Sequence, residues 1–175
     1  MSAFVSPGTP SIVAIEGDGT LPQAGVIAYR IRRGVVQVLL MTSRDTGRWI
    51  IPKGNIKPGT TPSKAAAQEA FEEAGVKGTI VSSTPLGVYT YAKKLGSGEA
   101  RSATVEVFLL QVKKQVKKWP EKGERKLAWV SAKKAVELVE EPGVVPLLRG
   151  LTEFEDVAEV RREQPPKTSP EVDKF

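Results

Sequence analysis

The sequence contains no cysteine and no histidine among its 175 residues. A Ser-His-Asp triad, a cysteine nucleophile, a thiolate or imidazole zinc site and an iron–sulfur cluster are therefore excluded. Disulfides are excluded as well, so nothing in the composition indicates an oxidising compartment. Any catalysis must use carboxylates, Lys, Arg, Tyr, hydroxyls, backbone amides or a hard cation held by oxygen atoms.

Long apolar runs are missing too. The longest stretches, at 24–29 and 38–41, are far shorter than the roughly 20 residues that span a bilayer. The first residues, MSAFVSP, have neither the cationic start nor the apolar run of a secretory signal. We therefore expect a cytoplasmic protein without a membrane partner.

Charge is unevenly distributed along the chain. The net charge is +6, while residues 44–64 carry +4 and residues 93–134 carry +8, with an acidic triplet between these two stretches. If the basic stretches converge in the fold, they form a funnel for an anionic substrate.

The composition indicates one soluble globular domain, with 40% apolar and 26% charged residues. We expect a flexible segment over 1–20, a single domain over 21–162 and a disordered, proline-rich tail over 163–175. Hydrophobic patterning predicts strands at 24–31, 35–42, 49–51, 79–92, 102–112 and 127–130. It predicts helices at 62–74, 131–140 and 144–160. This order indicates an α/β fold with a mixed sheet and helices packed on it.

The helix predicted at 62–74 has clear end signals. Thr61 can act as N-cap, Pro62 suits the first helical position, and Gly75 can end the helix in the left-handed conformation. The boundaries of this helix are therefore the best determined in the chain.

This helix carries three carboxylates on one face, because Glu69, Glu72 and Glu73 are spaced i, i+3 and i+4. They lie in its second half, where the helix dipole disfavours anions. A solvated acidic face is one interpretation. A hard divalent cation is the other, because Mg²⁺ takes a few carboxylates together with water and phosphate oxygens. The rigid, basic loop at 52–59, PKGNIKPG, favours the cation, since it can turn a carbonyl toward a metal and Lys53 toward a phosphate.

Residues 54–76 resemble the signature motif of the Nudix hydrolases. The matching positions are Gly54, Glu69, Ala70, Glu72, Glu73, Gly75 and Val76. Two positions depart from the motif: Thr60 stands where the family has its first Glu, and Gln68 where it has an Arg. In the family these two side chains pair and brace the metal loop against the helix, so the substitutions predict a neutral brace, with a Thr60–Gln68 hydrogen bond as one form of it.

Two further segments, 43–52 and 119–130, resemble the diphosphoinositol-polyphosphate and dinucleoside-polyphosphate hydrolase branch of that family. The resemblance implies an α/β/α sandwich and a Mg²⁺ or Mn²⁺ cofactor. It implies metal ligation by Glu69, Glu73 and the Gly54 carbonyl. Glu72 is then a further ligand or a water-orienting base, so Glu72 and Glu73 are the catalytic candidates. The implied substrate-binding residues are Ser43, Arg44, Lys53 and Arg125.

The implied reaction is attack of water on phosphorus in a highly phosphorylated small molecule. Diadenosine or other nucleoside polyphosphates come first and diphosphoinositol polyphosphates second, because a basic pair of the branch falls here on Pro22 and Gln23. Removal of pyrophosphate from 5′-phosphorylated RNA is an alternative, and no other nucleic-acid partner is expected. A non-catalytic module that binds polyanions on the same scaffold is the alternative from another class. The oligomeric state is left open.

Three other features have two interpretations each. Glu106, among apolar neighbours, is either an extra catalytic group or a carboxylate that reaches water at a strand end. Tyr89 and Tyr91 either stack a ring or pack in the core. The lysines of 113–118 either bind nucleic acid or form a solvated edge.

Overall fold

The computed structural model describes residues 19–153. Its strands are β1 (Leu21–Arg32), β2 (Val35–Thr42), β3 (Trp49–Ile50), β4 (Lys53–Asn55), β5 (Val76–Ile80), β6 (Gly87–Lys94), β7 (Ala100–Gln115) and β8 (Leu127–Ser131). The helices are α1 (Pro62–Ala74) and α2 (Ala132–Leu138), and the chain is helical again from 145 to the last described residue.

The strands form one mixed sheet, in which β1 is central. On one edge β1 pairs in parallel with β7 over nine residue pairs, and on the other edge it pairs antiparallel with β4 and β2. The far edge of β7 carries β6 and β5, and β2 also carries β3 and β8. Residues 23–28 of β1 are buried, as expected for a strand covered on both faces.

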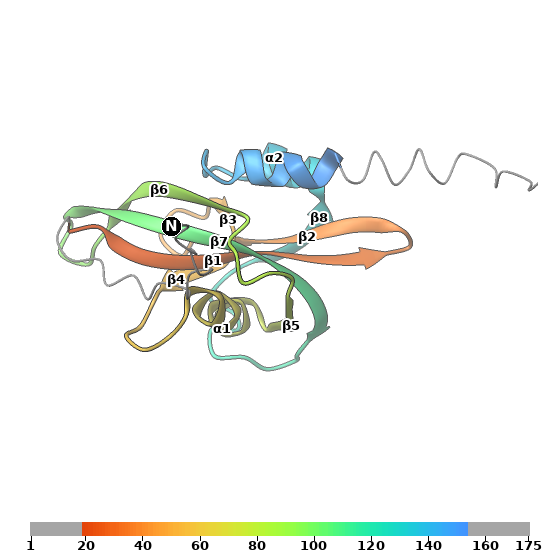
Figure 1. Cartoon of the computed structure of the whole chain (residues 1–175), viewed down its shortest axis with the longest axis horizontal. Coiled ribbons are helices and arrows are strands. Elements are labelled where there is room, and N and C mark those ends of the chain that lie inside the picture. Colours follow the sequence, from red (N-terminus) through yellow and green to blue (C-terminus); the bar gives the residue numbers. More distant parts are fainter. Residues whose placement is uncertain (1–18, 154–175) are drawn as a thin grey trace, which may run out of the picture.

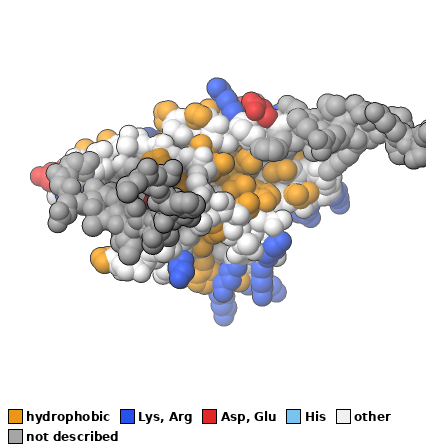
Figure 2. All heavy atoms as spheres, in the orientation of Figure 1, with side chains coloured by type: hydrophobic (Ala, Val, Ile, Leu, Met, Phe, Trp, Pro, Cys, Tyr) orange, Lys and Arg blue, Asp and Glu red, His pale blue; other side chains and the backbone are white. Residues whose placement is uncertain are grey.

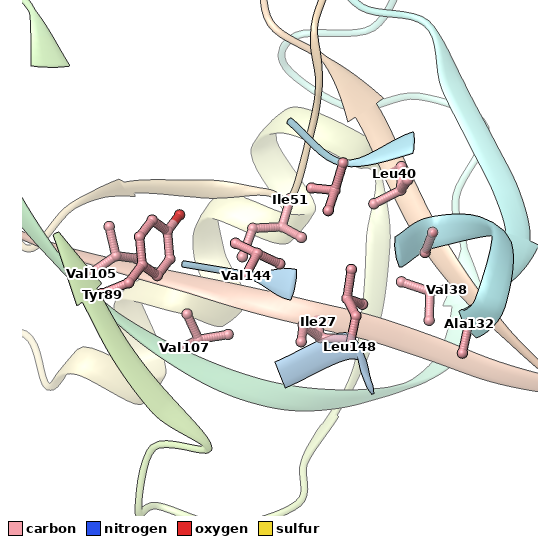
Figure 3. Packing of buried hydrophobic residues seen from close by; sticks show 12 residues of the cluster. Ile27, Val38, Leu40, Ile51, Tyr89, Val105, Val107, Ala132, Val144 and Leu148 are labelled. Atoms are coloured by element: carbon pink, nitrogen blue, oxygen red, sulfur yellow. The ribbon is translucent and has the colours of Figure 1, made fainter. Parts of the chain in front are cut away.

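Helices cover both faces of this sheet, as Figure 1 shows with α1 below the strands and α2 above them. Between α1 and the sheet, small helix residues pack against strand residues. This layer consists of Ala24, Val26, Ala28, Leu39, Ala65, Ala66, Ala70, Ala74, Val76, Phe108 and Leu110. The opposite layer, seen in Figure 3, joins the strands to α2 and the last described helix through residues that include Ile27, Leu40, Val107, Ala132, Val144 and Leu148. The predicted α/β/α sandwich is confirmed.

Helix α1 begins and ends where its end signals predict. The Thr61 side chain accepts from the backbone N–H of Lys64, Pro62 is the first helical residue, and Gly75 ends the helix at φ 69°. The four buried alanines of α1 let it lie close to the sheet. This close packing places the acidic second half of α1 over the β1–β4 region.

One predicted strand is wrong. Residues 79–92 were expected to be continuous, but they form the end of β5 and most of β6, separated by residues 81–86. Both strands use the same edge of β7, since Val81 donates to the Leu109 carbonyl and Leu86 to that of Val107. Pro85 lies in this detour and has no N–H to donate to the ladder.

The remaining element predictions hold with shifted ends. The helix expected at 131–140 is α2 at Ala132–Leu138, and β4 was not predicted. The last helix is present from 145 to 153; its remaining predicted part, and the tail at 163–175, lie outside the described residues. No helix between residues 19 and 153 is long and apolar enough to cross a membrane.

The lysines of 113–118 lie at the surface. Lys113, Lys114, Lys117 and Lys118 are all exposed, and Figure 2 shows basic side chains gathered on the lower part of the molecule, over the region of α1 and β5. Their exposure at the end of β7 agrees with the solvated-edge interpretation.

Candidate active site

A large open cavity, of about 1050 Å³, lies between α1, the basic loop (residues 52–59) and the segment that follows α2. Its wall combines both charge signs, with seven basic and six acidic side chains. The basic ones are Arg44, Arg48, Lys53, Lys57, Lys93, Lys94 and Arg125, and the acidic ones are Asp45, Glu69, Glu73, Glu121, Glu140 and Glu141. We call this space the central cavity. The basic stretches of the sequence converge here only in part: residues 44–64 contribute four basic side chains and residues 93–134 contribute three, and carboxylates accompany them.

Glu73 is the most buried carboxylate of α1, with 4% of the residue exposed. Its Oε1 accepts the backbone N–H of Lys53 at 3.0 Å, and its Oε2 lies 2.6 Å from Nη2 of Arg125. Burial raises the pKa of Glu73 to about 7, although the Arg125 charge and the Lys53 N–H act to lower it. In its ionised form the buried side chain is held by one cation and one backbone amide.

Glu69 lies one turn earlier and contacts the backbone of the basic loop. A Cβ atom added to Gly54 would clash with the Glu69 carboxylate, so only glycine permits this approach. Burial, and then the charge of Glu72, raises the pKa of Glu69. Carboxylate and loop backbone therefore meet at the floor of the central cavity.

Glu72 is placed differently from its two neighbours. It does not line the central cavity, and its Oε1 accepts a hydrogen bond from Gln68 Nε2 at 2.7 Å. Within residues 19–153 no hydrogen bond joins Gln68 to Thr60, so the Thr60–Gln68 form of the brace is absent. The Gln68 amide instead donates its hydrogen bond to the Glu72 carboxylate.

These residues fit a hard divalent cation. Glu69, Glu73 and Gly54 line the same cavity. Carboxylate oxygens and a backbone carbonyl oxygen are the kinds of ligand that Mg²⁺ prefers. Among the described residues, no group of three or more Asp or Glu side chains is arranged so that it could hold a metal ion. Mg²⁺ does not require one, because it commonly keeps several waters and binds substrate phosphates.

The predicted phosphate-binding arginines both lie in the central cavity, and both are paired. Arg125 has an 8% exposed side chain and also donates from Nη1 to the Thr42 carbonyl at 3.1 Å. Arg44 is 58% exposed and lies 3.3 Å from Glu121 and 3.6 Å from Glu124. Arg44 can therefore exchange its partners at little cost, whereas Arg125 cannot.

Ser43 and Lys53 also line the central cavity. The Ser43 hydroxyl closes the 43–48 turn, bonding to Thr46 Oγ1 at 2.7 Å and accepting the Arg48 N–H at 3.2 Å. The Lys53 ammonium is buried and pairs with Glu141. Both side chains thus have protein partners in addition to any phosphate.

A polar network around the buried Gln23, which the sequence did not indicate, completes the wall. Gln23 donates to Asn55 Oδ1 at 2.8 Å and accepts from the Tyr91 hydroxyl at 2.7 Å, while Lys93 Nζ also bonds Asn55 Oδ1, at 3.1 Å. Burial raises the pKa of Tyr91 to about 12. The tyrosine therefore stays a neutral donor, and β1, β4 and β6 are joined at the cavity wall.

Tyr89 belongs to both the cavity wall and the core. It is 8% exposed and packs in the apolar layer on the α2 side, while its hydroxyl donates to Glu141 Oε2 at 3.2 Å. The Tyr89 and Tyr91 ring centroids are 6.2 Å apart. Core packing is confirmed for Tyr89. Glu106 does not line the central cavity.

A mixed sheet between two helical layers, with an acidic helix facing a glycine-bearing loop, defines the class of fold and site. Residues 21–153 match the family model described as the NUDIX domain. The chain therefore belongs to the Nudix family, as the motif at 54–76 predicted.

Several curated relatives carry the same kind of domain. Nudix hydrolase 16, mitochondrial, of Arabidopsis thaliana is 31% identical over 138 residues, covering 71% of this chain and 76% of that protein. Diphosphoinositol polyphosphate phosphohydrolase 3-alpha of Mus musculus is 30% identical over 125 residues, covering 70% and 71%. Nudix hydrolase 13, mitochondrial, of Arabidopsis is 38% identical over 108 residues. The matched region spans only about half of that protein, 53%, and 52% of Nudix hydrolase 12.

Solved structures show the same fold. A binary complex of the Ap4A hydrolase of C. elegans superposes with a TM-score of 0.58 at 24% identity, covering 79% of this chain and 99% of that one. The predicted resemblance to the diphosphoinositol- and dinucleoside-polyphosphate branch is thereby confirmed at the level of family and fold.

Proposed function

We propose that this protein is a hydrolase that cleaves a phosphoanhydride bond in a highly phosphorylated small molecule by water attack on phosphorus. The observation that carries the proposal is the floor of the central cavity, where the Glu69 carboxylate meets the loop backbone at Gly54 and the Glu73 carboxylate meets it at Lys53. Family membership supports it, as do the relatives that are named hydrolases.

The cofactor in this proposal is Mg²⁺ or Mn²⁺, held by Glu69, Glu73 and the Gly54 carbonyl, with Glu72 as a further ligand or water-orienting base. When bound, the cation neutralises phosphoryl charge and lowers the pKa of a water ligand. The chain itself positions these groups. Arg125 and the Lys53 amide hold the two oxygens of Glu73 in place. The close packing of α1 on the sheet fixes the position of Glu69 relative to Gly54.

The substrate class follows from the size and rim of the cavity. Its volume of about 1050 Å³ lies at the upper end of ordinary ligand pockets. Arg44 and Lys93 at the wall, together with Ser43, would hold the phosphates remote from the scissile bond. Nucleoside polyphosphates remain the first candidates, because Gln23 is uncharged and its side chain is committed to Asn55 and Tyr91. Relatives named for diphosphoinositol polyphosphates keep that class second.

A non-catalytic polyanion-binding module is the second candidate. It is favoured by the 2.6 Å pair between Glu73 and Arg125, because a carboxylate already neutralised by a guanidinium competes poorly for a cation. The cytoplasmic location stays a sequence-based prediction, and so does the use of a 5′-phosphorylated RNA.

One experiment separates these functions. The full chain is incubated with Mg²⁺ or Mn²⁺ and a panel of nucleoside, dinucleoside and inositol polyphosphates and 5′-triphosphorylated RNA, with products identified by mass. The matched control is Glu73→Gln, which keeps size and removes the charge, and its turnover should be at least about a hundredfold lower. Binding of the panel without turnover in wild type would establish the module instead.

A further inference from the structure

Lys53 is anchored at both ends. Its backbone N–H donates to Glu73 Oε1 at 3.0 Å, and its side chain, 8% exposed, pairs with Glu141. Lys53 is the second residue of the basic loop and the first residue of β4. Lys53 therefore links helix α1 to the segment that follows α2, on opposite sides of the central cavity.

Glu141 is itself held firmly. Its side chain is 13% exposed and its Oε2 accepts the Tyr89 hydroxyl at 3.2 Å. The backbone on either side is fixed as well, since Glu140 donates to the Trp49 carbonyl at 3.2 Å and the Glu141 carbonyl accepts from Val144 at 3.0 Å. Glu141 is therefore a rigid anchor for the Lys53 ammonium rather than a mobile surface carboxylate.

Beyond Lys53 the basic loop is held mainly through β4, which pairs with β1, and through the hydrogen bonds of Asn55 to Gln23 and Lys93. Its side toward α1 is packed less closely. A small cavity of about 10 Å³ separates the loop from α1, lined by Asn55, Lys57, Thr60, Ala65, Gln68 and Glu69. This is about the volume that one water molecule requires. Within the described part of the chain, no ion pair joins residues 54–60 to α1, and Gln68 bonds to its own helix at Glu72. Among residues 19–153, the ion pair of Lys53 with Glu141 is the only one that joins the basic loop to another segment.

We infer that Glu141 is a positioning residue for the candidate cation site. It holds the Lys53 side chain, and together with the β4–β1 pairing this keeps the Lys53 N–H on Glu73 and the neighbouring Gly54 against Glu69. Because the Lys53 ammonium is then already neutralised, its contribution is to loop geometry and not to phosphate affinity. The kinetic part of this inference rests on the proposed hydrolysis and the binding part on the proposed cation site, whereas the exchange part rests on neither.

The test compares Glu141→Gln with wild type in the full chain. Without substrate, calorimetric titration with Mn²⁺ should give a Kd weakened about tenfold or more, the size of effect seen when the partner of a metal ligand is lost. Hydrogen exchange should accelerate at the amides of residues 53–57. With a substrate from the panel, kcat should fall while KM stays within about twofold. Glu141→Asp, which retains the charge, should restore part of the Mn²⁺ affinity, and it also serves if Glu141→Gln does not fold.

The matched control is Glu137→Gln, which removes a carboxylate from an exposed pair with Lys134, at 2.9 Å on α2; all three readouts should stay at wild-type values. In the double variant, the loss of Mn²⁺ binding free energy should be smaller than the sum of the losses in Glu141→Gln and Lys53→Met, because both substitutions remove the same interaction.

The opposite result has a distinct signature. If Glu141 only neutralises a phosphate-binding Lys53, its removal frees the ammonium, so KM falls while Mn²⁺ affinity and exchange stay unchanged; that would overturn the inference. If wild type hydrolyses nothing in the panel, yet Mn²⁺ affinity depends on Glu141 as stated, the proposed function fails and the positioning role stands.

Discussion

Arg125→Ala should destabilise the cation-free protein strongly, because it leaves Glu73 buried without its counter-charge. Both side chains of the pair are at most 8% exposed, and the two atoms are 2.6 Å apart. Removing one partner of a buried pair typically costs about 3–5 kcal/mol. We expect the lower end, about 3 kcal/mol, because Glu73 keeps its hydrogen bond from the Lys53 N–H.

For a chain of this length such a loss lowers Tm by about 6–12 °C. The melts are recorded with EDTA at pH 8, where Glu73 with its pKa of about 7 is mostly ionised. Arg44→Ala is the control, since Arg44 is 58% exposed and its pairs contribute no more than about 1 kcal/mol.

Added Mg²⁺ should then stabilise Arg125→Ala more than wild type, because the cation can neutralise Glu73 without displacing a guanidinium. A ligand at a hundred times its Kd stabilises by about 2.7 kcal/mol, which would recover most of the loss. Equal melting losses in Arg125→Ala and Arg44→Ala, with equal responses to Mg²⁺, would refute the assignment of Arg125 as the counter-ion of Glu73.

Three further changes test separate parts of the structure. Glu106→Gln should raise Tm at pH 8 but not at pH 4, in paired thermal melts: burial raises the pKa of Glu106 above 4.5, so its ionisation in the folded state removes stability as pH rises through that pKa. A loss of turnover in this variant would revive the catalytic interpretation. Gly54→Ala should displace the Glu69 carboxylate and weaken Mn²⁺ binding at least about tenfold by calorimetry, whereas Gly96→Ala, with open space around it, should not. Arg44→Ala should raise KM more for a four-phosphate than for a two-phosphate substrate, and less at high ionic strength; equal effects would exclude a phosphate contact.

The elements that the sequence predicted well are those whose signals are local. The ends of α1 depend on Thr61, Pro62 and Gly75, each of which acts on its own turn of the chain. The split between β5 and β6 depends instead on which stretch of one shared edge of β7 each strand pairs with. Alternating apolar residues cannot express that choice, so a single strand was the simpler prediction.

The candidate site divides in the same way. Spacing along one helix places Glu69 and Glu73 together, and the motif adds Gly54. Glu141, in contrast, reaches Lys53 across 88 residues of sequence. Its position is set by the packing of α2 on β2 and β8 and by the hydrogen bond from Glu140 to Trp49. A Glu-Glu pair before Pro-Gly carries no signal of the contact with Lys53.

The end of α1 ties the acidic helix to the loop that carries Arg125. Gly75 adopts φ 69°, and a Cβ there would lie 2.5 Å from the Trp119 ring, while Glu121 donates to the Glu72 carbonyl at 3.0 Å. Two independent constraints thus exclude every side chain at position 75. A chimera that exchanged only residues 54–76 with a relative would import a helix without the surface on which its last turn rests. A chimera should therefore exchange α1 together with the loop that carries Trp119 and Arg125.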